Sequence, residues 1–241
     1  MKTIGLDIGT TTICAAVLRS ETGEQLDRIT VESGAALASD TPWERLQSPK
    51  KIEATCLELL GALRKRHPDA ERLGITGQMH GLLYLDGAGR PLSPLYTWED
   101  GRGNQLCGDG RTCARLLSDL TGWPMATGYG LTTLFYNRAH GLAPEGASVC
   151  CTVMDYIAMR LCGRQKPFTH PTNADSFGLF SLKTMDFDPT ALAAAGVDRE
   201  LLPEVVRGEK LIGDASGLGV ALPIGDNQAG ILGSVTGDGD T

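Results

Sequence analysis

The chain has 241 residues, of which 41% are hydrophobic and 21% charged, and its formal net charge at pH 7 is -7. This length and composition allow a substantial buried core at the upper end of the size of one domain. The acidic balance, without a basic stripe, argues against nucleic acid as a partner. No apolar run approaches the ~20 residues of a membrane span, and the first residues enter a strand pattern in place of a signal peptide, so we expect a cytoplasmic protein without a membrane partner.

Seven cysteines are scattered along the chain, and none forms a CxxC pair. An odd number of cysteines without metal-ligand spacing argues against a disulfide framework and against a zinc site. We therefore expect most of the cysteines to be small residues of the core.

The first element is an apolar strand that delivers the carboxylate of Asp7 into a turn of small residues and hydroxyls. Gly9 can take the open backbone angles of a tight turn, and the three threonines after it offer hydroxyls and amides to an anion. A carboxylate beside phosphate makes sense mainly if a divalent cation, bound through water, lies between them. The alternative is a β-hairpin whose threonines simply favour strands. The threonines are Thr10, Thr11 and Thr12.

The next elements predict a sheet that begins with three antiparallel strands. Residues 13–19 and 25–31 have strand patterns separated by a hairpin signal. Apolar residues at helical spacing predict a helix over 49–67, which Pro68 ends. Further on, we expect strands at 73–76, 82–85 and 148–153 and helices at 104–120, 131–140, 155–162 and 227–235.

Two polar segments interrupt this pattern. Gln78, Met79 and His80 lie between two short strands, where side chains can reach a cleft, although a lone histidine in a buried loop is commonly a structural residue. Trp98 offers an apolar wall for a ligand, or it packs in the core. Near the end, Asp226 precedes a helix of small residues, where an aspartate also serves as an ordinary helix cap.

Four motifs in this order resemble the N-terminal domain of the FGGY family of carbohydrate kinases, in the actin, Hsp70 and sugar-kinase superfamily. The resemblance covers essentially all 241 residues. It implies an α/β, ribonuclease-H-like fold, with a mixed sheet whose first three strands are antiparallel and which helices flank. The motifs are Asp-Ile-Gly-Thr-Thr-Thr at 7–12, Gly-Gln-Met-His-Gly at 77–81, Trp-Glu-Asp-Gly-Arg at 98–102 and Gly-Asp-Asn-Gln-Ala-Gly at 225–230.

The resemblance implies ATP-dependent phosphorylation of a ketose hydroxyl, with Asp226 as the catalytic base. It implies that Asp7 organises Mg²⁺ through water, while Gly9 and the three threonines contact the phosphates of ATP or fix the turn that does. It also implies that Trp98 and Asp100 bind the sugar, and we expect Glu99 and Arg102 to hold that loop by ion pairing. The expected substrate-binding residues are Gln78, Met79, His80, Trp98, Asp100, Asp155, Asn173 and Asp226.

Within the family, the stretches 126–135 and 154–163 look more like sedoheptulokinases than xylulokinases. A sedoheptulose-type substrate is therefore favoured. Two alternatives stay open: a xylulokinase-type pentulose kinase, and a non-catalytic sugar- or nucleotide-binding protein of the actin type.

The resemblance also implies a second domain of similar size that carries the adenosine pocket and closes over the first. Nothing in the 241 residues corresponds to it. We expect residues 1–241 to form the N-terminal domain, whose partner is the missing C-terminal domain of the same polypeptide. We also expect this fragment to bind ketose weakly and to turn over ATP negligibly alone.

Overall fold

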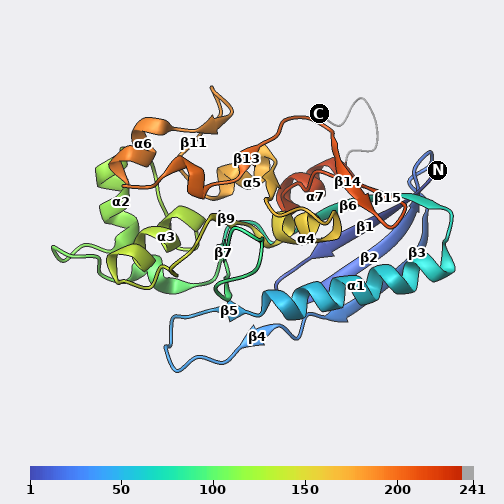
Figure 1. The fold of residues 1–241 in the computed structure, drawn as a ribbon, viewed down its shortest axis with the longest axis horizontal. Helices are drawn as coiled ribbons and strands as arrows, with labels where there is room; N and C mark the ends of the chain where they lie inside the picture. The colour runs from blue at the N-terminus through green and yellow to red at the C-terminus, as the bar shows by residue number, and fades with distance from the viewer. Residues whose placement is uncertain (235–241) are drawn as a thin grey trace.

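The computed structural model describes residues 1–234, and its centre is a six-stranded mixed sheet in the order β14-β15-β6-β1-β2-β3 (Figure 1). The first three strands are antiparallel neighbours, while β6 runs parallel to β1 and to β15. The expected mixed sheet with three antiparallel first strands is confirmed. Its strands are β1 (Lys2–Ile8), β2 (Thr12–Arg19), β3 (Gln25–Glu32), β6 (Ala70–Gly77), β14 (Leu211–Ala215) and β15 (Leu218–Ala221).

One face of this sheet is covered by α1 (Pro49–Arg66) and α4 (Val153–Leu161), as Figure 1 shows. Alternation in β1 and β2 turns one set of side chains, such as Leu6 and Val17, into the core beneath these helices. The helix α1 begins where the Ser48 hydroxyl accepts a hydrogen bond from the Lys51 amide, and it ends in basic residues that suit a helix C-terminus. The predicted helix over 49–67 is confirmed.

The opposite face of the sheet carries Asp7 and Cys14, which are registered across β1 and β2. The last described helix, α7 (Asp226–Ser234), packs beside β6 at this face. An apolar cavity of about 330 Å³ lies there, between Asp7 on β1 and Ile224 and Ala229 at α7. Residues far apart in the sequence therefore meet on one side of the sheet. The predicted helix 227–235 is present, although its last residue lies outside the described part.

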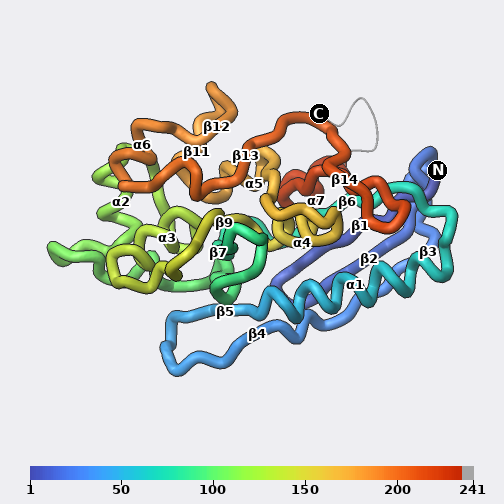
Figure 2. Tube along the Cα trace, viewed as in Figure 1, coloured from blue at the N-terminus to red at the C-terminus, as the bar shows by residue number. Residues whose placement is uncertain are grey.

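A second cluster of buried side chains is built mainly from helices and lies beside the sheet domain, at the left of Figure 2. Short strand pairs join the two parts. The helices are α2 (Cys113–Thr121), α3 (Gly130–Ala139), α5 (Pro171–Ser176) and α6 (Pro189–Ala194), with short 3-10 turns at Gly101–Asn104 and Arg199–Leu201. The short strands are β4 (Ala36–Leu37), β5 (Leu46–Gln47), β7 (Leu83–Leu85), β8 (Leu95–Tyr96), β9 (Val149–Cys151), β10 (Phe168–Thr169), β11 (Phe180–Ser181), β12 (Asp186–Phe187) and β13 (Glu204–Val205).

The expectation of a helix over 104–120 and of no disulfide is wrong between Cys107 and Cys113. The chain reverses here, because Gly108, Asp109 and Gly110 all have positive φ and the Cys107 amide donates to the Arg111 carbonyl. This reversal brings the two cysteines together, with their Cα atoms 4.8 Å apart, and they form a disulfide. The helix α2 starts only at Cys113.

The remaining cysteines are free, and Cys56, Cys150 and Cys151 lie in the core as expected. Among residues 1–234, no helix combines the length and the apolar character needed to cross a membrane.

Candidate active site

Asp7 and Asp226 lie on the same face of the sheet, since Asp7 shares a cavity with Ile224 and Ala229, the residues on either side of Asp226. Burial raises the pKa of the Asp7 carboxyl above its ordinary value, and the negative charge of Asp226 raises it further. The chain before Asp226 is bound to the strand beside β1, since the Ile224 amide donates to the Ile75 carbonyl (3.2 Å) and the Thr76 hydroxyl donates to the Ile224 carbonyl (2.9 Å). The sheet therefore fixes both carboxylates against the same frame.

Asp226 is exposed and is the first residue of α7. The first helical hydrogen bond runs from the Ala229 amide to the Gly225 carbonyl (2.9 Å). The Asp226 carboxylate accepts the Asn227 amide (2.8 Å). A Cβ at Gly225 would lie 2.5 Å from the sulfur of Met79, so only glycine lets Met79 pack this closely under the turn. The carboxylate thus projects from a helix start, as expected, with Met79 beneath it.

The turn after β1 is held by bonds from distant segments. The Gln47 side-chain amide donates to the Thr10 carbonyl (2.7 Å), and the Trp98 indole N–H donates to the Thr10 hydroxyl (3.0 Å). Thr11 and Thr12 have exposed side chains at the start of β2. Because Thr10 is bound within the protein, Thr11 and Thr12 are the threonines that present hydroxyls to solvent.

Gln78 is buried, and its side chain is used to hold the same turn. Its amide donates to the Gln47 side-chain oxygen (2.9 Å), and its own oxygen accepts the Thr10 hydroxyl at 3.5 Å. Gln47 was missed by sequence reasoning, because a lone glutamine one residue before the cap of α1 carries no pattern. Gln78 therefore supports the turn of residues 9–12, called the threonine turn below, and its own amide is not exposed.

His80 lies in the left-handed region, with φ 61°, at the end of the Gln-Met-His segment. Its Nδ1 is 2.8 Å from the Ser176 carbonyl oxygen, which can only accept, so Nδ1 donates and the neutral ring keeps Nε2 as an acceptor. The ring stacks on Tyr129, with centroids 4.8 Å apart and planes 7° apart. Tyr129 is a further aromatic residue of this site that sequence reasoning missed, since only the folded chain brings it to His80.

Trp98 is 48% exposed, and the backbone around it is tightly packed. A Cβ at Gly128 would lie 2.1 Å from the Trp98 carbonyl oxygen, so the loop that carries Tyr129 passes directly against Trp98. Thr10 thus binds the indole N–H of Trp98, and Gly128 packs against the Trp98 backbone. The free surface of the indole suits the apolar wall expected for a sugar.

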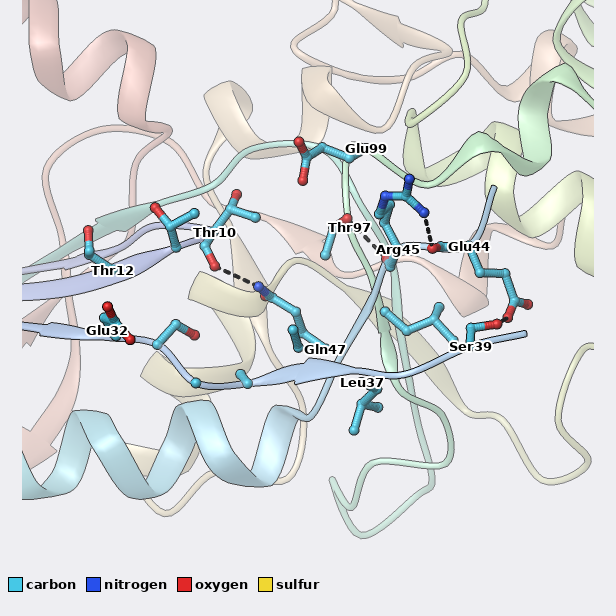
Figure 3. A pocket seen from close by; sticks show the side chains of 16 residues that line it. Thr10, Thr12, Glu32, Leu37, Ser39, Glu44, Arg45, Gln47, Thr97 and Glu99 are labelled. Carbon is cyan, nitrogen blue, oxygen red and sulfur yellow. Dashed lines mark hydrogen bonds between the residues drawn. The ribbon is translucent and has the colours of Figure 1, made fainter. Parts of the chain in front are cut away.

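A cavity of about 620 Å³ borders the threonine turn, and Figure 3 shows Thr10, Thr97, Glu99 and Gln47 around it. Its lining includes the threonine turn but neither Asp7 nor Asp226. The cavity therefore borders the threonine turn and is separate from Asp7 and Asp226.

Asp100 is fully buried in an ion pair with Arg102, with Nε 2.6 Å from Oδ1. The other oxygen of Asp100 accepts the Arg45 amide (3.0 Å). The Arg102 guanidinium also bonds Asn137 (2.5 Å) and lies over the Tyr96 ring at 4.0 Å. The expected ion pairing by Arg102 is present, and it occupies Asp100. A direct contact of Asp100 with sugar stays a prediction, and it requires this pair to open.

Asp155 and Asn173 are also fully buried, and they contact each other, with the Asn173 amide 3.2 Å from the Asp155 carboxylate. Burial is the largest influence on Asp155 and raises the pKa of its carboxyl to about 7. The structure thus places these two residues behind the site, away from the exposed side chains Trp98 and Asp226. Their direct contact with sugar likewise stays a prediction.

Asp7 fits a hydrated divalent cation, with Asp226 left for the proton. Within residues 1–234 neither carboxylate forms an ion pair, and no cluster of three or more His, Cys, Asp or Glu side chains surrounds them. Two neighbouring carboxylates repel each other, which is the second cause of the raised Asp7 pKa. A site with so few protein ligands suits Mg²⁺, which keeps most of its waters and binds phosphate oxygens.

The chain is similar to known carbohydrate kinases over nearly its whole length. A sequence profile described as "FGGY family of carbohydrate kinases, N-terminal domain" matches residues 2–233. Sedoheptulokinase of Mus musculus is 28% identical over 263 residues, which cover 95% of this chain and 54% of that protein. Xylulose kinase of Streptomyces rubiginosus is 29% identical over 250 residues, which cover 95% of this chain and 49% of that protein.

Solved structures share the fold. A gluconate kinase from Lactobacillus acidophilus superposes with a TM-score of 0.80 at 22% identity, over 94% of this chain and 48% of the other. At this identity the likeness concerns the fold alone. The chain spans about half the length of the curated relatives that it matches.

Proposed function

The chain belongs to the FGGY family of carbohydrate kinases, and we propose that it supplies the sugar-binding and proton-accepting half of an ATP-dependent ketose kinase. The observation that carries the proposal is that the segment from Ile224 to Ala229, which includes Asp226, packs on the sheet face that carries Asp7. One carboxylate can serve the metal and the other the proton of the reacting hydroxyl.

Asp226 is the proposed base. Its carboxylate is exposed, accepts the Asn227 amide, and stands at the first turn of α7, whose amides give a positive field beside phosphate. A sugar hydroxyl within hydrogen-bond reach would pass its proton to Asp226 as its oxygen forms a bond to the γ-phosphorus and the bond to ADP breaks. The base then returns the proton to solvent.

The sugar is proposed to lie against Trp98 and His80. The exposed indole covers an apolar face of the substrate, and His80 Nε2 accepts a hydrogen bond from a sugar hydroxyl, since its Nδ1 is used by Ser176. Met79 supports the floor under Asp226, and Gln78 supports the turn. Tyr129 fixes the plane of the His80 ring.

The phosphates are proposed to lie at the threonine turn, where a Cβ at Gly9 would lie 2.9 Å from the Thr12 carbonyl oxygen and where Thr11 and Thr12 are exposed. Asp7 would hold Mg²⁺ through water, and the ion would neutralise charge on the phosphates when bound. Thr10 fixes the turn through Gln47 and Trp98.

For the substrate we propose a ketose of the sedoheptulose type. The support is the similarity to sedoheptulokinase over 95% of the chain. A pentulose is the second candidate, because a xylulose kinase is similar over the same share of the chain.

The proposal is tested first by binding. Sedoheptulose and xylulose are each titrated against the 241-residue chain in thermal denaturation, where ligand at 100 times its Kd stabilises by about 2.7 kcal/mol. His80→Asn is the matched variant, since asparagine tolerates the left-handed backbone but lacks the ring. We expect a shift with one ketose that His80→Asn reduces. No shift with any ketose would overturn the sugar-cleft assignment.

The second test concerns catalysis. In a full-length enzyme that carries this chain, Asp226→Asn should lower kcat by several orders of magnitude while ketose affinity is kept. An unchanged rate would remove Asp226 as the base. We also propose that the 241-residue chain alone turns over negligibly, which a coupled ADP-release assay checks.

A further inference from the structure

Behind the candidate base lies a buried polar cluster, defined here as Asp155, Thr169 and Asn173. These residues come from α4, β10 and α5, and none is more than 1% exposed. Asp155 is fixed in the first turn of α4, because its amide donates to the Thr152 hydroxyl that caps the helix (3.2 Å). Two of the three cluster residues, Asp155 and Asn173, thus lie in the first turn of a helix.

The cluster is bonded to the segment that ends in Asp226. The Asn173 side-chain amide donates both to Asp155 (3.2 Å) and to the Pro223 carbonyl (3.3 Å). The neighbouring Thr172 hydroxyl accepts the Gly225 amide (3.0 Å). Two consecutive residues of α5 thus hold the chain on both sides of Ile224, immediately before the base.

The same helix also holds the proposed sugar ligand His80. The Ser176 hydroxyl accepts the His80 amide (3.1 Å) and donates to the Asn173 carbonyl (2.6 Å). The position of α5 therefore sets the position of both groups that flank the substrate.

We propose that Asp155 is a positioning residue for Asp226, which it places by orienting the Asn173 amide toward the Pro223 carbonyl. This inference rests on the proposed function, since Asp226 matters as the base of that reaction. Asp155 is buried, and it reaches the Asp226 segment through the Asn173 amide. Without its carboxylate, the Asn173 amide would lose one of two acceptors and be free to rotate away from Pro223.

The cluster is not saturated with hydrogen bonds within residues 1–234. Asn173 Oδ1 has no partner there, and the Thr169 hydroxyl lies near the second oxygen of Asp155 without forming a hydrogen bond of good geometry. A buried carboxylate with an unpartnered oxygen is costly when ionised, in keeping with the pKa near 7 given above. The other titratable groups nearby are Cys151, whose thiol pKa burial raises, His170 at the cap of α5, whose pKa burial lowers, and Asp175, whose pKa burial raises.

The sign of the pH effect follows from linkage. The closed cluster binds the Asp155 proton more tightly than an opened one, so the free energy of opening falls as pH rises and levels off above about 7. As pH rises toward 7, protection of the Gly225 amide from hydrogen exchange should therefore fall by up to about tenfold per pH unit, after correction for the intrinsic exchange rate.

The test is amide hydrogen exchange by NMR on the 241-residue chain, which requires no sugar and so fails or succeeds separately from the proposed function. Asn173→Ala and Asp155→Leu should each raise exchange at Gly225 at least tenfold. Asp155→Asn keeps an acceptor and should preserve protection at pH 6, while it removes the pH dependence even though Cys151, His170 and Asp175 are unchanged.

The control is Leu192→Ala in α6, which removes a buried side chain of the other cluster. It should raise the exchange rate of the residue 192 amide. The exchange rate at Gly225 should rise by no more than the loss of global stability explains. If Asp155→Leu does not fold, Asn173→Ala and Asp155→Asn decide. Exchange at Gly225 that is unchanged in Asn173→Ala, or equally pH-dependent in Asp155→Asn, would overturn the proposal.

Discussion

Trp98 donates its indole N–H to the hydroxyl of Thr10 across 3.0 Å, although 88 positions separate the two residues. The proposed sugar wall and the proposed phosphate turn are thereby one connected unit. Thr10 is bound on its other side by Gln47, which also binds Gln78. A substitution that removes the indole N–H should therefore weaken the binding of the phosphates.

Trp98→Phe should separate these two roles in a full-length enzyme. Phenylalanine keeps an aromatic face but lacks the donor, so we expect a several-fold rise in the KM for ATP with the KM for ketose nearly unchanged. Trp98→Ala should raise both. Steady-state kinetics with each substrate varied gives the answer, and identical behaviour of the two variants would contradict the link between Trp98 and Thr10.

Asp226→Asn should lower the pKa of Asp7, because it removes one of the two causes that raise it. A raised pKa means that the folded state holds the proton more tightly than the unfolded state. The stability contributed by Asp7 is therefore lost as pH rises through its folded pKa. Asp226→Asn should lose less of its free energy of unfolding over this pH range than the parent chain. Carboxyl carbon NMR titration of Asp7 measures the shift. Asp214→Asn on β14 is the control and should leave Asp7 unchanged; an equal titration in all three proteins would show that Asp226 does not act on Asp7.

Arg102→Met should destabilise the chain by about 3–5 kcal/mol, because it leaves the Asp100 carboxylate buried without its partner. The double variant with Asp100→Leu should recover most of this loss, since no uncompensated charge remains. Arg90→Ala removes an exposed ion pair with Asp86 and should cost at most about 1 kcal/mol. Urea denaturation measures all three, and a loss for Arg102→Met no larger than for Arg90→Ala would refute the structural role.

Gly128→Ala should be far more harmful than Gly146→Ala, although both glycines have positive φ. An added Cβ at Gly128 meets the Trp98 carbonyl oxygen at 2.1 Å, whereas nothing lies within 4 Å at Gly146. We expect about 1 kcal/mol of strain at Gly146 and a further 1–3 kcal/mol or so from the backbone clash at Gly128. Denaturation gives the stabilities, and ketose binding should weaken only in Gly128→Ala; equal losses would mean that the Tyr129 loop yields easily.

The parts of this molecule that follow from local pattern were predictable. Alternating apolar residues gave the strands that carry Asp7, helical spacing gave α1, and a short motif pointed to Asp226 at a helix start. These features depend on near neighbours in the sequence. The approach of the two carboxylates was expected only through resemblance, since no periodicity records which sheet face α7 reaches.

The parts set by packing between distant segments were not predictable. Whether Asp100 faces a ligand or Arg102 is decided by Asn137 and Tyr96, which come from elsewhere in the chain. Burial of Asp155 beneath the Gly225 turn has the same origin. The disulfide was missed because its two cysteines meet only through a turn of residues with positive φ.

The left-handed backbone at His80 limits how the specificity of this protein can evolve or be redesigned. A β-branched residue there would suffer steric strain of about 1–2 kcal/mol or more, whereas asparagine, aspartate and glycine are tolerated. Libraries that randomise position 80 should therefore return a short set of small polar residues, whatever sugar is used for selection. New substrate preference is more readily gained from the surrounding aromatic positions, Trp98 and Tyr129, whose backbones accept many side chains.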